Sequence, residues 1–511
     1  MAFRSAILAA LALLAACTST PPPPLTDTVQ TRSGAMRGAA ENGMLIFRGV
    51  PYAAPPVGEL RWRPPQPTAS WAGVRDAREF GAMCVQAART APRIGLPLPI
   101  LPVSEDCLFL NVWTPAKSSG ERLPVVVWLH GGNFMTGSGA ATDGSKFAQR
   151  GIVVVSINYR IGPLGYLAHP ALSVESGRGV SGNYGLLDQI AALQWVHTNI
   201  AAFGGNPGKV TLMGQSAGAT SVLDIITSPL ARGLFSQAIV QSGGGSFGSQ
   251  TSLASEEKDG AALGADIAAL RAMPAEEIIA KYPQASAMRR AGHFYPNLDG
   301  YAVPKDIQQK LLAGEPAIPM LLGFNSDEGM FWSRDLPTNV TGYRTYLEEW
   351  FAEKDRDAVM ARYPAATDDR VNAIAAALAT DFKIEFSTLQ IARGMSKRAP
   401  VYLYRFSRVS PAARSTFGGA AHNMEVPYAF GAVTATPGQY EERDQALSEE
   451  MVSAWANFIK TGDPNGAGAP QWYMLNEFTE NLIEFGDTTR PGFADREMEA
   501  FFTVHPPQPE K

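Results

Sequence analysis

The five residues Gly214-Gln215-Ser216-Ala217-Gly218 constrain the fold of this chain more than any other segment. They directly follow the mainly apolar run 209–213 and precede the apolar stretch 219–226. A G-x-S-x-G sequence in that setting predicts a sharp strand-to-helix turn, because its small residues let the helix pass close to the strand. The helix N-terminus then presents backbone N–H groups and a positive dipole to developing negative charge. The turn therefore predicts a nucleophile at Ser216.

A series of short apolar runs predicts an α/β fold with a mainly parallel sheet. The runs are 124–129, 152–157, 209–213, 238–241, 318–323 and 401–404. Because they are nearly continuous rather than alternating, they indicate a sheet covered by helices on both faces. Residues 185–203 carry apolar side chains at helical spacing. Residues 251–300 and 330–400 are predicted to be helical insertions packed on one large domain, and 448–460 a terminal helix.

Composition narrows the class of protein. The 511 residues include 43 basic and 48 acidic side chains, which gives a formal net charge of -5. A nucleic-acid-binding protein normally has a basic excess, so the charge argues against a nucleic-acid partner. The three cysteines are too few for a disulfide scaffold, and their odd number leaves one thiol to explain.

Residues 1–16 are predicted to form a signal peptide, because Arg4 supplies a positive charge before the apolar run 6–16. That run is too short to span a bilayer. The run ends Leu14-Ala15-Ala16-Cys17, which resembles the lipobox of a bacterial lipoprotein. That resemblance implies a lipidated Cys17 followed by a proline-rich tether over 17–28. We therefore expect an exported protein, attached by lipid alone to the cell envelope on the periplasmic side of the outer membrane. The alternative is an ordinary signal peptide and a periplasmic or secreted protein.

A serine nucleophile requires a base, and the base requires an orienting acid. In folds with this turn the chain order is serine, acid, histidine. Among the six histidines, His422 is the only well-placed base, in the loop after the last predicted strand. His505 lies in a proline-flanked tail that we expect to be frayed. Asp327 and Glu328 both follow the run 318–323, and the residues alone do not choose between them.

Several sequence blocks, in order, resemble those of the type-B carboxylesterases, the family that also contains cholinesterases and bile-salt lipases. The resemblance extends from about Val29 to Thr461. Its blocks are Phe47-Arg48-Gly49-Val50-Pro51-Tyr52-Ala53, Glu105-Asp106-Cys107-Leu108, Leu110-Asn111-Val112, His130-Gly131-Gly132, Asn158-Tyr159-Arg160, Gly182-Asn183-Tyr184-Gly185-Leu186-Leu187-Asp188-Gln189 and Phe203-Gly204-Gly205-Asn206-Pro207. The resemblance implies an α/β-hydrolase fold in a single domain, residues 29–507, that hydrolyses small carboxylic esters. It implies no metal and no cofactor.

The resemblance also implies roles for individual residues. The family has a glutamate immediately before a glycine, which selects Glu328 over Asp327 as the acid and places the base at His422. Ser242 would be a second partner of Glu328.

The implied oxyanion hole consists of the backbone N–H groups of Gly132, Asn133 and Ala217. Many relatives have glycine where Asn133 stands. Backbone donation survives that difference, but it leaves the local dihedral angles open.

The other two cysteines, Cys84 and Cys107, match the family's N-terminal disulfide, which an exported chain permits. The loop 85–106 contains no Phe, Tyr or Trp. Cholinesterases place there a tryptophan that binds the quaternary ammonium by a cation–π contact. Gln215 also stands where many relatives have a glutamate. Both differences argue against choline esters as substrates.

Two rival functions share this pattern. The family contains non-catalytic adhesion proteins, but these lack the nucleophile. An acyltransferase or an amidase would use the same acyl-enzyme and differ only in the acceptor, and the sequence does not separate these from an esterase.

Overall fold

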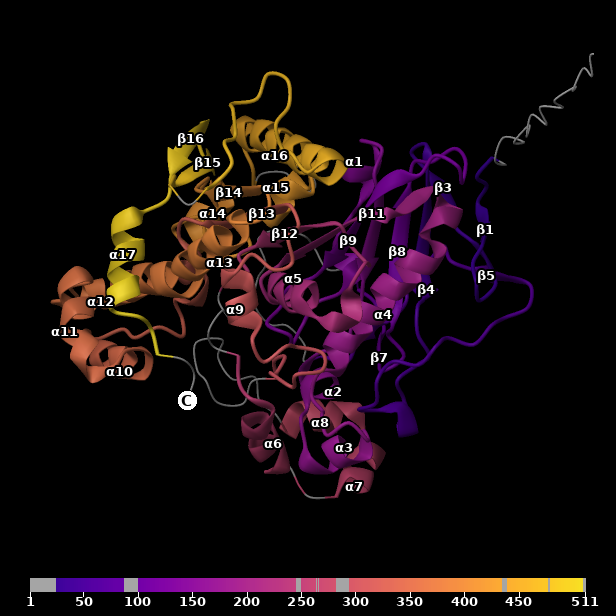
Figure 1. Cartoon of the computed structure of the whole chain (residues 1–511), viewed down its shortest axis with the longest axis horizontal. Helices are drawn as coiled ribbons and strands as arrows, with labels where there is room; N and C mark the ends of the chain where they lie inside the picture. The colour runs from indigo at the N-terminus through magenta and orange to yellow at the C-terminus, as the bar shows by residue number, and fades with distance from the viewer. Residues whose placement is uncertain are drawn as a thin grey trace, which may run out of the picture.

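The computed structural model describes residues 24–86, 100–244, 250–262, 264, 266–281, 294–433, 439–476 and 478–508 (Figure 1). The predicted signal peptide, the lipidation of Cys17 and the first part of the tether lie outside these residues, so they stay predictions. Among the helices of the described residues, none is long and apolar enough to cross a membrane.

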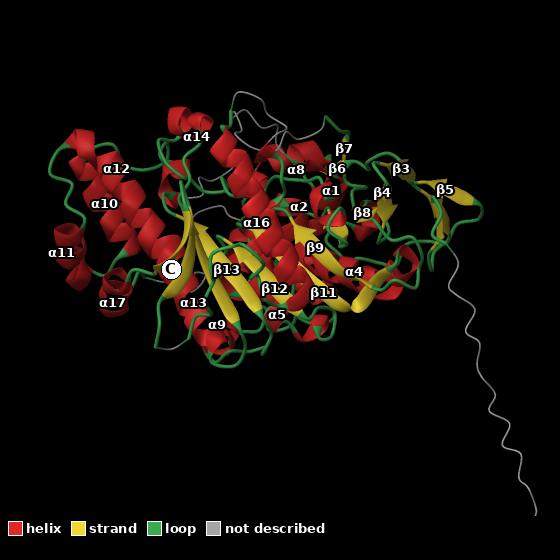
Figure 2. Ribbon diagram, turned by 90° about the horizontal axis from the view of Figure 1, so that it is seen from above, coloured by secondary structure: helices red, strands yellow, loops and turns green. Residues whose placement is uncertain are grey.

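Eleven strands form one mixed sheet in the described part of the chain (Figure 2). Their order across the sheet is β16 (Thr489–Phe493), β15 (Asn481–Phe485), β14 (Val401–Phe406), β13 (Met320–Asn325), β12 (Gln237–Gln241), β11 (Gly205–Gln215), β9 (Leu123–Leu129), β10 (Val153–Ile157), β8 (Phe109–Thr114), β4 (Met44–Pro51) and β3 (Ala39–Glu41). The seven strands from β15 to β10 pair in parallel. The outer pairs are antiparallel. The predicted mainly parallel sheet is confirmed, and the six predicted strands correspond to β9 to β14.

Side chains alternate between the two faces of the sheet along each buried strand. Because both sets are apolar here, helices cover both faces. Val125 and Val127 of β9 pack in one apolar cluster with residues of α4 (Tyr184–Asn199) and α5 (Ala217–Thr227). Val126 and Trp128 pack in a second cluster, on the other face, with residues of α16 (Glu442–Thr461). The continuous apolar strands of the sequence therefore reflect a sheet that is buried on both sides.

Shorter elements surround this sheet. Two small sheets consist of β1 (Thr28–Gln30), β2 (Ala35–Arg37) and β5 (Val74–Asp76), and of β6 (Met83–Cys84) and β7 (Val103–Ser104). The remaining short helices are α1 (Ser145–Ala148), α2 (Gly162–Tyr166), α3 (Pro170–Glu175), α9 (Ile307–Leu312), α14 (Pro411–Thr416) and α15 (Val426–Ala429).

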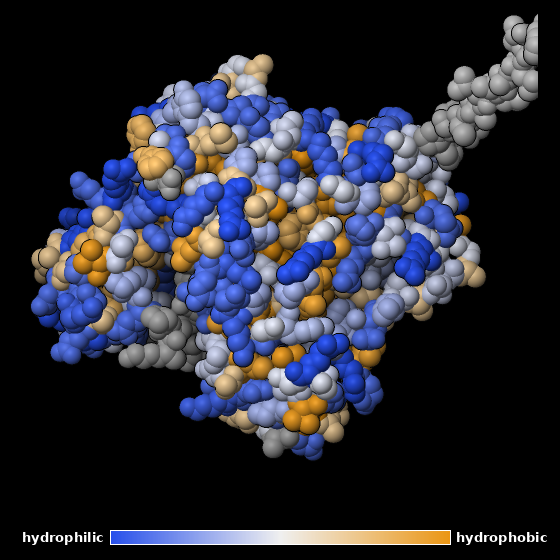
Figure 3. Space-filling view, in the orientation of Figure 1, coloured by the Kyte–Doolittle hydropathy of each residue, from blue (hydrophilic) through white to orange (hydrophobic). Residues whose placement is uncertain are grey.

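The described residues of the two predicted insertions are mainly helical, as expected. The first contains α6 (Leu253–Ala261), α7 (Ile267–Ala272) and α8 (Ala275–Lys281), at the bottom of Figure 1. The second contains α10 (Val340–Trp350), α11 (Glu353–Arg362), α12 (Asp368–Ala379), a π-helix (Thr380–Glu385) and α13 (Phe386–Ser396). The face of the molecule that is turned to the viewer in Figure 1 is largely covered by hydrophilic residues, with hydrophobic residues in smaller spots between them (Figure 3).

Two expectations about the end of the chain are wrong. The helix predicted over 448–460 is α16, and it is not terminal, because Gly462 ends it in a left-handed conformation and the chain continues through β15, β16 and α17 (Arg496–Val504). His505 is not in a frayed tail. It caps α17, and its Nδ1 lies 2.8 Å from Oδ1 of Asp355. β15, β16 and α17 were not predicted from the sequence because their apolar runs are short.

The G-x-S-x-G turn has the predicted strained geometry. Ser216 lies between β11 and α5 with φ 56° and ψ -125°, a backbone conformation that residues other than glycine rarely adopt. A Cβ atom added to Gly214 would lie 2.4 Å from the carbonyl oxygen of Gly218. One added to Gly218 would lie 2.1 Å from the carbonyl oxygen of Leu129. The glycines therefore permit α5 to start close against the sheet.

We expect Gly218→Ala to lower the free energy of unfolding by about 1–3 kcal/mol or more, because the new methyl group overlaps backbone that cannot move freely. Urea denaturation measures the change. Gly208→Ala is the matched control, since its Cβ would meet only the side chain of Asn206, at 3.4 Å. Equal stability of the two variants would contradict the tight packing of the turn.

Candidate active site

Three polar side chains meet at the carboxyl ends of neighbouring parallel strands. Ser216 follows β11, Glu328 follows β13, and His422 lies in the loop after β14. Because parallel strands end at the same edge of a sheet, residues more than 200 positions apart in the chain come into contact there.

A continuous chain of contacts joins the three residues. Nε2 of His422 lies 2.7 Å from Oγ of Ser216. On the other side of the ring, Nδ1 lies 2.5 Å from Oε2 of Glu328. Glu328 and His422 are buried, whereas Ser216 is partly exposed. Among the described residues, Ser216 is therefore the most exposed member of this chain of contacts.

The structure also separates the two candidate acids. Asp327 binds other groups, and its Oδ2 accepts hydrogen bonds from the hydroxyl of Ser326, at 2.6 Å, and from the N–H of Ala420, at 3.0 Å. Of the two carboxylates, Glu328 is the one on His422. The choice depends on which way each side chain leaves the end of β13, which neighbouring residues in a sequence do not reveal.

The carboxylate of Glu328 is held by two further donors. The hydroxyl of Ser242, at the end of β12, donates to Oε1 over 2.7 Å, as the family resemblance implied. The N–H of Asn325 donates to the same oxygen over 2.8 Å. These bonds leave Oε2 directed at His422 and fix the side chain without a counter-ion.

Opposing effects set the pKa of His422. Burial disfavours the charged ring, but the negative charge of Glu328 and its hydrogen bond favour it, and the net result raises the pKa above the usual value. The imidazole is thus a stronger base than a free histidine.

A second buried carboxylate, that of Glu425, lies behind this chain and was missed by the sequence-based reading. Its oxygens accept hydrogen bonds from Gln241, at 3.2 Å, and from the side chain of Asn325, at 2.8 Å. Burial and the nearby charge of Glu328 raise the pKa of Glu425 to about 7. Asn325 therefore contacts both carboxyl groups. The position of Glu425 three residues after His422 is the only signal in the sequence.

Aromatic side chains line the imidazole. The ring centroid of Trp332 lies 4.8 Å from that of His422, and the ring of Phe331 lies 5.6 Å away, edge on. Both belong to the 3₁₀ helix Glu328–Trp332, so the segment that provides the acid also covers the base. Gln215 is a close neighbour too, with Nε2 3.3 Å from Nε2 of His422, so an uncharged amide stands there.

Two of the three predicted oxyanion donors, Gly132 and Asn133, lie on a tight loop, residues 131–139, beside the serine. A Cβ added to Gly131 would come within 3.1 Å of Cβ of Ser216. Gly132 has φ 118° and Asn133 has φ 58°, so asparagine adopts a left-handed backbone that is typical of glycine. Within the described residues, the N–H groups of Gly132 and Asn133 donate to no acceptor of the protein. Ala217 is the first residue of α5, where helix geometry leaves the N–H without an intrahelical partner.

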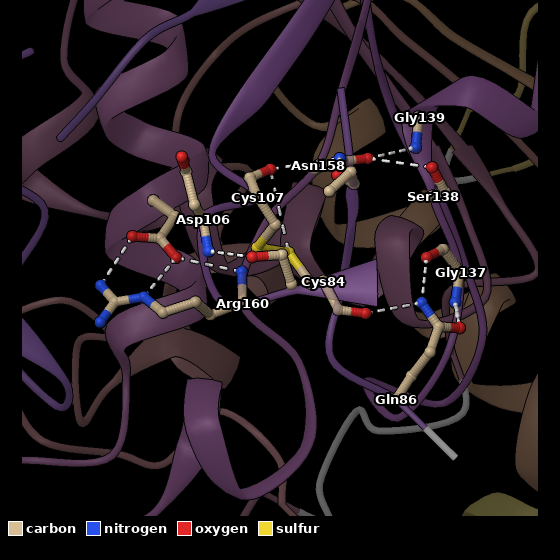
Figure 4. Close-up of a disulfide and its surroundings, with 12 residues drawn as sticks. Cys84, Gln86, Asp106, Cys107, Gly137, Ser138, Gly139, Asn158 and Arg160 are labelled. Carbon is tan, nitrogen blue, oxygen red and sulfur yellow. Dashed lines mark hydrogen bonds and ion pairs between the residues drawn. A yellow bond between two sulfur atoms is a disulfide. The ribbon is translucent and has the colours of Figure 1, made fainter. Parts of the chain in front are cut away.

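The predicted disulfide between Cys84 and Cys107 is present and lies against this loop (Figure 4). Next to it, Gln86 exchanges two hydrogen bonds with Gly137, of 2.9 and 3.0 Å. The side chain of Asn158 donates to the carbonyl oxygen of Cys107 over 3.2 Å and accepts from the N–H of Gly139 over 2.8 Å. The disulfide segment therefore braces the far end of the 131–139 loop.

The absence of an aromatic side chain from the loop 85–106 was the argument against choline esters. Residues 87–99 of this loop lie outside the described residues, so that argument stays a prediction. Within the described ranges, no group of three or more His, Cys, Asp or Glu side chains is placed to hold a metal ion.

Comparison with known proteins gives a consistent result. A family model described as the carboxylesterase family matches residues 26–502. The chain is 40% identical over 481 residues to fumonisin B1 esterase of Sphingopyxis macrogoltabida, with 90% of this chain and 87% of that protein covered. It is 35% identical over 495 residues to phenmedipham hydrolase of Pseudarthrobacter oxydans, covering 89% and 94%. The solved structure of a PNB esterase matches with a TM-score of 0.80 and 31% identity, over 93% of this chain and 99% of that one.

A mainly parallel sheet between two layers of helices, with a strained serine turn at the end of a central strand, defines an α/β-hydrolase. Within that class, the chain belongs to the carboxylesterase family and is a carboxylic-ester hydrolase.

We expect the double variant Cys84→Ser, Cys107→Ser to lose about 3 kcal/mol of unfolding free energy, because a loop of 23 residues is no longer closed in the unfolded chain. Urea denaturation measures the loss. A reductant should lower the stability of the parent protein and leave the variant unchanged. A parent protein that is insensitive to the reductant and equal to the variant would contradict a stabilising disulfide.

Proposed function

We propose that the protein hydrolyses carboxylic esters through an acyl-enzyme on Ser216, with His422 as general base and acid and Glu328 as the orienting acid. The observation that carries the proposal is the unbroken path from Oγ of Ser216 through the imidazole to a buried carboxylate. Such a path activates a hydroxyl that is otherwise a weak nucleophile.

The first half of the reaction forms the acyl-enzyme. His422 takes the hydroxyl proton as Oγ of Ser216 attacks the carbonyl carbon. The negative charge that develops on the carbonyl oxygen is stabilised by the N–H groups of Gly132, Asn133 and Ala217. The bond between the acyl carbon and the alcohol oxygen then breaks, and His422 gives its proton to the departing alcohol.

The second half repeats these steps with water. His422 takes a proton from the water molecule as its oxygen attacks the acyl carbon, and returns it to Oγ as the acid leaves. Throughout, Glu328 keeps Nδ1 protonated and so leaves Nε2 free to accept a proton from the serine. Its charge stabilises the imidazolium that forms in each half-reaction, and the bonds from Ser242 and Asn325 keep it in position.

We expect Ser216→Ala to lower kcat roughly 10⁴–10⁶-fold on a short p-nitrophenyl ester, because no other group can form the acyl-enzyme. Steady-state release of p-nitrophenol measures the effect. Ser221→Ala is a matched control in α5, the helix that begins directly after Ser216. It removes a buried hydroxyl, and within the described residues this hydroxyl has no hydrogen-bond partner. Turnover by Ser216→Ala close to that of the parent would overturn the proposal.

The raised pKa of His422 predicts how activity depends on pH. His422 must be neutral to accept a proton, so kcat/KM should fall as the pH drops through a pKa above the usual value of about 6.5. In Glu328→Gln the carboxylate that favours the charged ring is gone. The acid limb of the profile should then move to lower pH, and kcat should fall by on the order of 10³–10⁴. An acid limb at the same pH in both proteins would show that the charge of Glu328 does not act on the base.

A further inference from the structure

The loop 131–139, called the oxyanion loop from here on, contains two consecutive residues that are not glycine and have left-handed backbone. Asn133 has φ 58° and Phe134 has φ 55°. Asparagine tolerates this region, but it also populates others, and phenylalanine enters it rarely. Such a conformation persists only where the surrounding structure holds it. Glycine at position 133 would adopt the same φ with no side chain to anchor.

One side chain from a distant segment contacts both residues. The hydroxyl of Tyr295 donates a hydrogen bond to Oδ1 of Asn133, across 162 positions of sequence. The ring of the same tyrosine lies edge on against Phe134, with centroids 5.3 Å apart and an interplanar angle of 81°. Phe134 is buried and is held from the other side by the ring of Tyr166, 5.0 Å away.

We propose that Tyr295 is a positioning residue for the oxyanion hole. Its hydroxyl holds the side chain of Asn133, and through it the peptide N–H groups of Gly132 and Asn133, in the direction that meets the oxyanion. This inference rests on the proposed function, because those N–H groups matter only if a tetrahedral intermediate forms beside Ser216.

The contact between Tyr295 and Asn133 lies where its loss should change the loop locally and leave the fold intact. Asn133 and Tyr295 are both partly exposed, so water can solvate the amide of Asn133 once the phenol is removed. The N–H of Thr136 donates to the carbonyl oxygen of Gly132 over 3.0 Å, in the same peptide group that carries the N–H of Asn133, so Thr136 supports this donor together with Tyr295. The far end of the loop is fixed independently, because Gln86 holds Gly137 and Asn158 holds Gly139. Removing the hydroxyl of Tyr295 should therefore loosen the donors without unfolding the loop.

A double-mutant cycle tests the proposal. Tyr295→Phe should lower kcat on a short p-nitrophenyl ester roughly 10-fold with KM little changed, a fraction of the 10²–10³ expected for complete loss of an oxyanion donor. Asn133→Gly keeps the backbone N–H and removes the side chain that Tyr295 contacts, so the kcat of this variant is the reference for the second arm of the cycle. In the Asn133→Gly background, Tyr295→Phe should change kcat less than about twofold, since there is no side chain left to hold.

A second readout separates positioning from a structural effect. A trifluoromethyl ketone forms a tetrahedral oxyanion on the serine, so its Ki should rise in Tyr295→Phe by the same factor by which kcat/KM falls. The unfolding midpoint should stay unchanged. Tyr301→Phe is the matched control, because it removes a phenol hydroxyl from the same segment, where the ring lies under Arg178 and not against the loop.

Three results would overturn the proposal. They are an unchanged kcat in Tyr295→Phe, an equal loss in both backgrounds, or a loss of kcat without a rise in the Ki of the ketone. Failure of the proposed function would show itself differently, as a parent protein whose ester turnover does not depend on Ser216.

Discussion

The site depends on the parallel hydrogen bonding of β11 to β14. That pairing brings the ends of four strands to one edge of the sheet, so Ser216, Ser242, Glu328 and His422 meet there although they come from separate segments. The strained turn at Ser216 is possible because Gly218 lets α5 start against the backbone of β9. Burial of the sheet on both faces keeps this edge rigid, which a serine, a base and an acid within hydrogen-bond distance of one another require.

The oxyanion loop is organised differently from the three side chains on the sheet. It is not part of a strand or a long helix, and its left-handed residues need support from outside. The disulfide segment braces it through Gln86, Asn158 fixes Gly139, and Tyr295 contacts Asn133 and Phe134. The sheet thus positions the proposed nucleophile and base, whereas side chains from several distant segments contact the loop with the proposed backbone donors.

Much of the site could be predicted from local sequence. The glycines around Ser216 specify the turn, and the position of His422 after a strand leaves it as the well-placed base. Asp327 and Glu328 could not be separated on the residues alone, because they are adjacent and chemically alike. Glu425, Trp332 and Tyr295 could not be predicted either, since none lies in a periodic pattern or a motif whose chemistry points to the site. Short apolar runs likewise concealed β15, β16 and α17.

The sequence by itself determined the mainly parallel sheet, the strand-to-helix turn and the nature of the chemistry, because these follow from apolar periodicity and from glycine at positions where a Cβ would clash. Only the tertiary structure decided which carboxylate faces His422, how Asn133 takes the place of a glycine, and which distant side chains hold the loop. Those outcomes depend on side-chain directions and on contacts between residues far apart in the chain, 94 positions for Glu328 and His422 and 162 for Asn133 and Tyr295. The order of residues along a chain does not encode such contacts locally.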